Sequence, residues 1–286
     1  MIPVMLVALA IVLACPVPRV MARLSVLRSA PRAALFAWQA VTLSAIVAAV
    51  AAAPAILPLV LFDGQAVWQH FVVMCVAGGV SLVMIGRLLL AGHRIGHRMR
   101  VMRTRHRELV DIIARHDSRD AALRILAHPT PTAYCLPGRH RRVVVSQGVI
   151  EALNERELVA VLSHEQAHLR ARHDLLIEFF SVIHETVPAL VRSPAAMSEV
   201  RLLVEALADR AAARRAGVPA TTRALDVLAG GRAPEASMAV SAAGMAPVRI
   251  ALLRRGWPNP LLSTVVYTYA AALLALPCGL VALAWG

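Results

Sequence analysis

The sequence lacks several signatures that would assign it to common protein classes. Its four cysteines include no Cys-x-x-Cys pair, so neither a disulfide framework nor a cysteine zinc site is indicated. Neither a glycine-rich phosphate loop nor a serine nucleophile elbow is present. Acidic residues are scarce, with 17 Asp and Glu against 30 Lys and Arg and a net charge of +13. No nucleic-acid recognition motif or aromatic interleaving accompanies this charge, so we expect no nucleic-acid partner.

Apolar residues, by contrast, are abundant and lie in long runs. They make up 58% of the 286 residues, and the mean hydropathy is +0.65, both of which indicate a membrane protein in contact with lipid. A membrane-crossing helix needs about 20 apolar residues. We predict four such helices, at residues 2–18, 33–61, 67–91 and within 258–286. The first ten residues contain no Lys or Arg, so a cleaved signal peptide is not expected.

The placement of arginine predicts the orientation in the membrane. Four arginines (Arg19, Arg23, Arg28 and Arg32) follow the first predicted span, and a basic run "HRIGHRMRVMRTRHR" follows the third. The segment after the second span contains no Lys or Arg. Because loops rich in Lys and Arg stay in the cytoplasm, we expect both termini outside and residues 93–257 inside the cell.

Residues 93–257 are long enough for one domain core. We expect a basic amphipathic helix over 94–116, short strands at "LRILAH", "TAYCL" and "RVVVS", and helices over 154–172, 174–191 and 196–216. The predicted organisation is therefore three transmembrane helices in 1–92, a cytoplasmic domain in 93–257 and a fourth transmembrane helix in 258–286. The fold class is mainly α, a polytopic membrane protein with a cytoplasmic α+β domain.

The stretch "VLSHEQAHLRARHD" carries the strongest chemical signal in the chain. On a helix, His164 and His168 project side by side and can share one Zn²⁺, while Glu165 lies close enough to hold a water without being a ligand. The apolar residues of this helix place Glu165 inside their arc. Because such polar groups are costly against a core, a bound cation would compensate them.

A third ligand is expected from "VEALADRAAARR". Glu205 lies 37 residues after His168 and can complete the protein ligands of a catalytic zinc, which leaves one position for water. Asp209, one turn later, can accept a hydrogen bond from the remote ring nitrogen of a ligand histidine. His173 and Asp174 are expected to be a solvated or capping pair, and Cys135 an ordinary strand residue.

The layout of spans around "HEQAH" and "EALAD" resembles the BlaR/MecR-type membrane metallopeptidases. The resemblance implies a zincin-like domain with His164, His168 and Glu205 as ligands and Glu165 as the base. It also implies a signalling role, in which the enzyme cuts a transcriptional repressor. The β-lactam sensors of that family carry a penicillin-binding domain after the fourth span, and none follows Gly286. A role in β-lactam sensing is therefore not assumed.

The predicted function is a membrane-embedded zinc endopeptidase with one zinc per chain, acting on a cytosolic repressor-like protein. Two alternatives remain open. The first is a membrane quality-control protease of the HtpX or CAAX-prenyl-protease type, which shares the metal-binding logic and an E-x-x-x-D element. The second is a non-catalytic adaptor that zinc stabilises.

Overall fold

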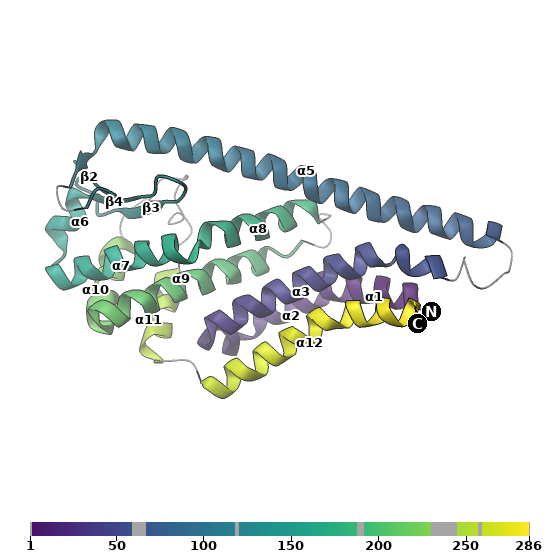
Figure 1. Cartoon of the computed structure of the whole chain (residues 1–286). Helices are drawn as coiled ribbons and strands as arrows, with labels where there is room; N and C mark the ends of the chain where they lie inside the picture. Colours follow the sequence, from purple (N-terminus) through teal and green to yellow (C-terminus); the bar gives the residue numbers. More distant parts are fainter. Residues whose placement is uncertain are drawn as a thin grey trace. The chain divides into compact units, whose positions relative to one another are not determined.

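A computed structural model describes residues 2–58, 67–117, 120–187, 192–229, 245–256 and 259–285 (Figure 1). These residues form two compact units. The first comprises residues 1–93, 180–199 and 258–286, and the second comprises 94–179 and 200–257.

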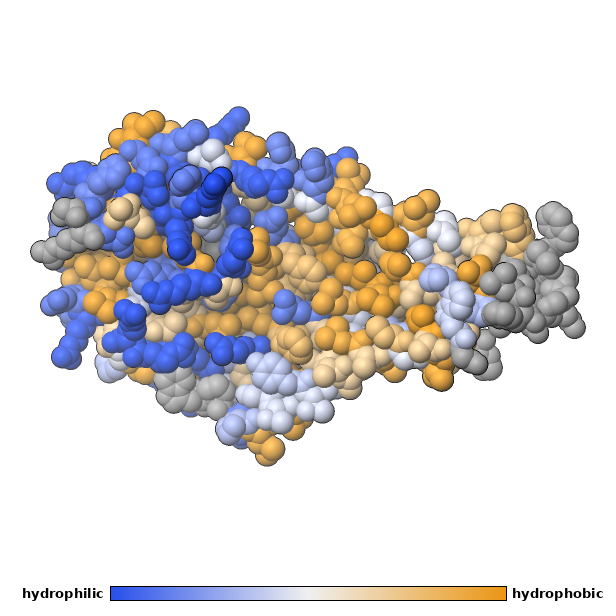
Figure 2. Space-filling model, in the orientation of Figure 1, coloured by the Kyte–Doolittle hydropathy of each residue, from blue (hydrophilic) through white to orange (hydrophobic). Residues whose placement is uncertain are grey.

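The first unit contains the apolar helices. Its elements are α1 (Ile2–Ala14), α2 (Pro16–Arg23), η1 (Ser25–Ser29), α3 (Pro31–Ala51), η2 (Pro54–Ile56), the first part of α5 (Val67–Ile113) and α12 (Pro260–Trp285). Helices α1, α3 and α12 pack together, with the Ser44 hydroxyl donating to the Leu273 carbonyl at 2.7 Å. Hydrophobic side chains cover these helices (Figure 2), as expected where the solvent is lipid rather than water.

Among the described residues, four helical stretches are long and apolar enough to cross a membrane, and this agrees with the predicted number. They are Ile2–Arg23, Pro31–Ala51, Met74–Ile113 and Pro260–Trp285. The second is shorter than predicted, because α3 ends at Ala51 and a short 3-10 helix begins at Pro54. Proline lacks the backbone N–H that would continue the α-helical ladder. Residues 59–61, the predicted end of this span, lie outside the described residues.

The second unit contains a four-stranded sheet and the helices that pack on it. Its strands are β1 (Arg115–His116), β2 (Leu123–Leu126), β3 (Ala133–Leu136) and β4 (Arg142–Ser146), in the order β1-β2-β4-β3. Strands β2 and β4 are parallel, and the β1–β2 and β3–β4 pairs are antiparallel. The helix predicted over 94–116 therefore ends early, at Ile113, because Arg115 and His116 pair with β2.

The helices after the sheet are α6 (Gln147–Ala152), α7 (Glu155–Ala171), α8 (His173–Thr186), α9 (Pro194–Ala216), α10 (Val218–Ala229) and α11 (Ala246–Arg254). Gly148, at the start of α6, lies so close to the Pro129 carbonyl that a Cβ atom would be 1.9 Å from its oxygen. Only glycine permits this approach.

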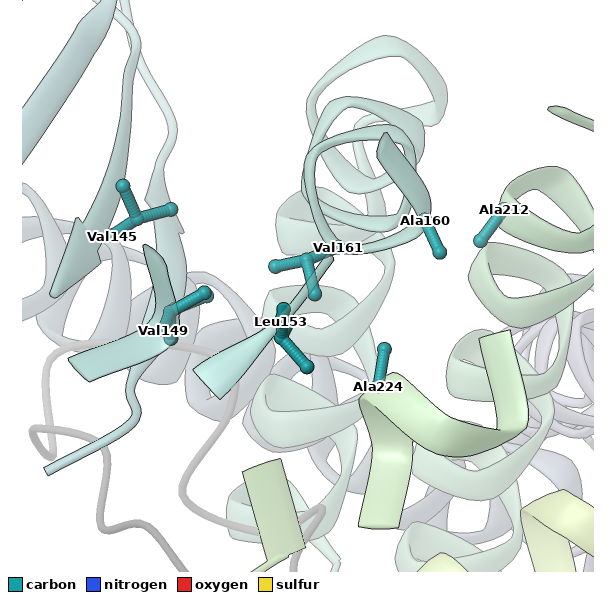
Figure 3. Packing of buried hydrophobic residues seen from close by; sticks show 8 residues of the cluster. Val145, Val149, Leu153, Ala160, Val161, Ala212 and Ala224 are labelled. Atoms are coloured by element: carbon teal, nitrogen blue, oxygen red, sulfur yellow. The ribbon is translucent and has the colours of Figure 1, made fainter. Parts of the chain in front are cut away.

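The core of the second unit joins the sheet to α7, α9 and α10. Val145 and Val149 extend from the β4–α6 segment toward Leu153 and Val161, while Ala160 of α7 faces Ala212 of α9 (Figure 3). Small alanine side chains at this contact let the helices approach closely, and the packing fixes α7 against the sheet. The predicted fold class, a mainly helical membrane protein with an α+β domain, is confirmed.

Candidate metal centre

Helix α7 carries the histidine pair, and its start is set by local sequence. Asn154 accepts a hydrogen bond from the Glu157 N–H, and the Glu157 carboxylate accepts one from the Asn154 N–H, both at 3.0 Å. This reciprocal capping box fixes the first turn. Two turns later, Glu165 and His168 are 6% and 3% exposed. The helix therefore directs both polar side chains into the domain interior, as the apolar arc predicted.

Three side chains converge on one point. The Nε2 atoms of His164 and His168 lie 3.0 Å apart, and α9 brings the Glu205 carboxylate to 3.4 Å from His164 and 3.5 Å from His168. The potential ligand atoms of all three residues lie within 4.8 Å of one another, and among the described residues they are the group found suitable for a metal ion. Two imidazoles and one carboxylate, with further coordination open to water, are the donor set of a catalytic zinc.

Each ligand histidine has a second partner at its remote ring nitrogen. The His164 Nδ1 lies 3.0 Å from an Asp209 oxygen, a distance at which the carboxylate can accept a hydrogen bond from the ring. The His168 Nδ1 lies 3.0 Å from the Nδ1 of His173. With His168 donating and His173 accepting, both ligand rings would present Nε2 to the metal in a fixed tautomer.

The expectation of a solvated His173–Asp174 pair was wrong. Both residues are buried, at 5% and 7% exposure. The cause is a sharp bend at Arg172, which adopts the left-handed conformation with φ 52° and ends α7. The bend returns His173 to His168 and lets Asp174 pair with Arg103 of α5 at 3.2 Å. No periodicity in the sequence signals this reversal, because arginine rarely adopts a positive φ.

Arg249, on α11, is a site residue that the sequence analysis did not identify. Its guanidinium donates to both Asp209 oxygens, at 2.8 and 2.6 Å, and forms an ion pair with Oε2 of Glu205 at 3.0 Å. It is 4% exposed. Arg249 lies 40 residues after Asp209, and one arginine among many in a basic chain carries no local signal of such a contact.

These charges determine the protonation of the two carboxylates. Burial raises the pKa of Glu205 and Asp209, but the Arg249 guanidinium and the nearby histidines outweigh burial and lower both pKa values. Both groups are therefore ionised at neutral pH, the form in which a carboxylate can bind a metal or accept a hydrogen bond.

The pKa values of the two ligand histidines are shifted in opposite directions. Burial alone would lower the pKa of both. At His168 burial dominates and lowers the pKa to about 3, whereas at His164 the Asp209 and Glu205 carboxylates outweigh it and raise the pKa to about 10. A ligand histidine must be deprotonated at the nitrogen that binds a metal, so we expect zinc affinity to fall as the pH is lowered.

Glu165 is beside the three-residue group rather than in it. Its carboxylate contacts the Cys135 thiol of β3, and burial raises its pKa. Burial and the Glu165 charge raise the pKa of the Cys135 thiol well above its ordinary value, which favours the neutral S–H form. Cys135 lies in a strand, as expected, and it also borders Glu165.

Comparison with known proteins finds similarity to metallopeptidases over part of the chain. Residues 97–201 match the model of Peptidase family M48. The chain is 37% identical over 94 residues to the plastoglobule-localized metallopeptidase 48, chloroplastic, of Arabidopsis thaliana, covering 29% of this chain and 27% of that protein. It is 39% identical over 62 residues to the protease HtpX homolog of Lactobacillus acidophilus, covering 21% of this chain and 20% of that protein. No solved structure matches the chain.

The chain thus spans only about a quarter of the length of these relatives. The matched region includes the HExxH stretch, and the geometry adds Glu205 to the histidine pair, so both agree with the predicted zinc site of the form HExxH with a distant Glu. The comparisons favour the HtpX-type alternative over the BlaR/MecR-type resemblance, and they lend no support to a signalling role or a repressor partner.

Proposed function

We propose that this chain is a membrane-anchored endopeptidase of the M48 type that hydrolyses peptide bonds of membrane proteins, in the manner of a quality-control protease. The observation that carries the proposal is the convergence of His164, His168 and Glu205, with Glu165 beside them and not among them. Four candidate spans in the same chain support substrates at the membrane.

In the proposed reaction, His164, His168 and Glu205 hold one zinc ion. When bound, zinc acts as a Lewis acid that polarises a substrate carbonyl and makes water more acidic. Glu165 is the general base that takes a proton from water and passes it to the leaving amine. Burial raises the pKa of Glu165, and a raised pKa makes a carboxylate a stronger base. Asp209 and His173 hold the histidine rings in place.

Two strand-like runs, "TAYCL" and "RVVVS", are candidates for binding an extended substrate. The second forms β4, which lies between two strands, and the first contains β3, which is last in the strand order. Strand β3 packs against α7, and its Cys135 contacts Glu165. All four residues of β3 are buried, so neither of these two strands presents an exposed edge to which a substrate could add by backbone pairing.

Substrate capture with Glu165→Gln tests the function. This variant should bind substrates without cutting them, so crosslinking in cells followed by purification should recover several membrane proteins. His164→Ala, which lacks a zinc ligand, is the control for non-specific capture. Recovery of one dominant soluble regulator would instead indicate a signalling protease that cuts this regulator, and not a quality-control protease. Capture no greater than the control, with an unchanged cellular phenotype, would favour a zinc-stabilised adaptor.

The proposed topology places both termini outside and the metallopeptidase domain in the cytoplasm, from the arginine distribution. In a cysteine-free background, Arg139→Cys should resist impermeant thiol reagents in intact cells, because Arg139 is exposed on the second unit and this unit would face the cytoplasm. Gln65→Cys, between the second and third predicted spans, should label. Permeabilised cells provide the control, since both positions should then react. Labelling of Arg139→Cys in sealed cells would reverse the orientation.

A further inference from the structure

Arg249 contacts two acidic residues of the metal centre, although it lies on α11, far from both of them in the sequence. Its side chain is 5% exposed, and it lies against Glu205 and Asp209, whose side chains are 7% and 1% exposed. The rest of α11 is attached differently: Leu252, with Met245 just before the helix, packs on the apolar surface of Leu202 and Ala206. Arg249 is therefore the point at which α11 reaches the polar centre.

Arg249 contacts both carboxylate oxygens of Asp209 but only one carboxylate oxygen of Glu205 in these three contacts. Both oxygens of Asp209 receive N–H donors from Arg249, and Oδ1 also lies 3.0 Å from His164. At Glu205 the guanidinium forms an ion pair with Oε2 at 3.0 Å, and this oxygen also lies 3.4 Å from His164 Nε2. The other oxygen, Oε1, lies 3.5 Å from His168 Nε2. Arg249 thus makes the two oxygens of the third ligand chemically different.

We propose that Arg249 is a positioning residue that makes Glu205 a one-oxygen ligand. With Oε2 held by the guanidinium, Oε1 is the oxygen left for the metal, since a second cation at Oε2 would face the positive charge of Arg249 at close range. A carboxylate limited to one oxygen leaves a coordination position for water, which a two-oxygen ligand would occupy. The proposal rests on the zinc site and not on the proposed substrates.

The geometry favours this role over simple charge balance. Two buried carboxylates beside one cation would be neutralised by any positive side chain, whether arginine or lysine. The contacts seen here need a planar group with several fixed donors, because one residue holds three oxygens on two side chains. Arginine supplies such a fork, and lysine supplies one mobile ammonium group. The two explanations therefore predict different results for Arg249→Lys.

Cobalt substitution gives a readout that does not depend on peptide hydrolysis. Co²⁺ replaces Zn²⁺ in the purified full chain, and its visible d–d bands are stronger in four-coordinate than in five-coordinate sites. We expect a four-coordinate spectrum for the unchanged protein and a weaker, five-coordinate one for Arg249→Lys, with zinc affinity lower by roughly 10- to 100-fold, as for other residues that orient metal ligands. Arg254→Lys, an exposed position on the same helix, is the matched control and should change neither.

A second variant guards against misfolding and leaves the other site residues in place. Arg249→Gln keeps a planar group with N–H donors and removes the charge. If Arg249 only balances charge, Arg249→Lys will show the spectrum of the unchanged protein. If Arg249 positions Glu205, neither lysine nor the shorter glutamine will hold Oε2, and both spectra will be five-coordinate. An unchanged cobalt spectrum in either folded variant overturns the proposal, whatever the outcome of the substrate-capture experiment.

Discussion

Glu165→Gln is expected to keep about one zinc per chain and to lower peptide hydrolysis by about 10²- to 10⁴-fold, the usual cost of losing a general base. Zinc should remain because Glu165 is not among the three residues that converge on the metal position. Hydrolysis should fall because glutamine has nearly the same shape and cannot accept the proton. Metal analysis and cleavage of a generic unfolded protein in detergent are measured on the same sample.

The control for this variant is Glu155→Gln, an exposed glutamate in the first turn of the same helix. It should leave both zinc content and hydrolysis near the values of the unchanged protein. Loss of zinc in Glu165→Gln would make Glu165 a ligand and would contradict the assignment. Retention of full activity would require a different base, and His173 would then be the nearest candidate because it is buried beside His168.

His168→Ala is expected to lose most of the zinc and nearly all activity. His168 is 3% exposed and lies between His164, His173 and Glu205, so its loss removes a ligand and leaves two protein ligands, which bind weakly. His184→Ala provides the control, since His184 begins a second His-Glu pair on α8 that is not part of the ligand group. Equilibrium dialysis with a competing chelator measures both affinities.

Glu205→Gln should lower zinc affinity as well as activity, which distinguishes it from Glu165→Gln. The amide keeps an oxygen for the metal but loses the negative charge that the ion neutralises. Full zinc and full activity in this variant would mean that the third ligand is elsewhere. Glu199 is a poor replacement, because it already forms an ion pair with Arg28, and Glu178 lies near Arg103 at 3.8 Å.

The sequence by itself determined the features that local patterns encode. The apolar runs indicate the four candidate spans, since a bilayer requires a minimum length of continuous hydrophobic helix. Asn154 and Glu157 encode the start of α7 through hydrogen bonds three residues apart. The four-residue spacing of His164 and His168 gives one shared face, so the metal pair follows once the helix is known. Glu205 could also be identified, because zinc chemistry requires a third ligand.

Other features depended on residues that meet only after the chain has folded. Strand β2 pairs with β4 and not with its sequence neighbour β3, and this order places β3 last in the sheet. His173 is buried because one residue, Arg172, takes a left-handed conformation.

Arg249 shows most clearly what only the tertiary structure decided. Several arginines in the basic second unit could have neutralised Asp209 and Glu205 on charge alone, and the sequence does not choose among them. The packing of Leu252 and Met245 against α9 brings this one to the site. A buried carboxylate demands a partner because desolvation is costly, so the sequence implies that a cation is needed. Which residue provides it depends on long-range packing, and that in turn decides which oxygen of Glu205 is left for the metal.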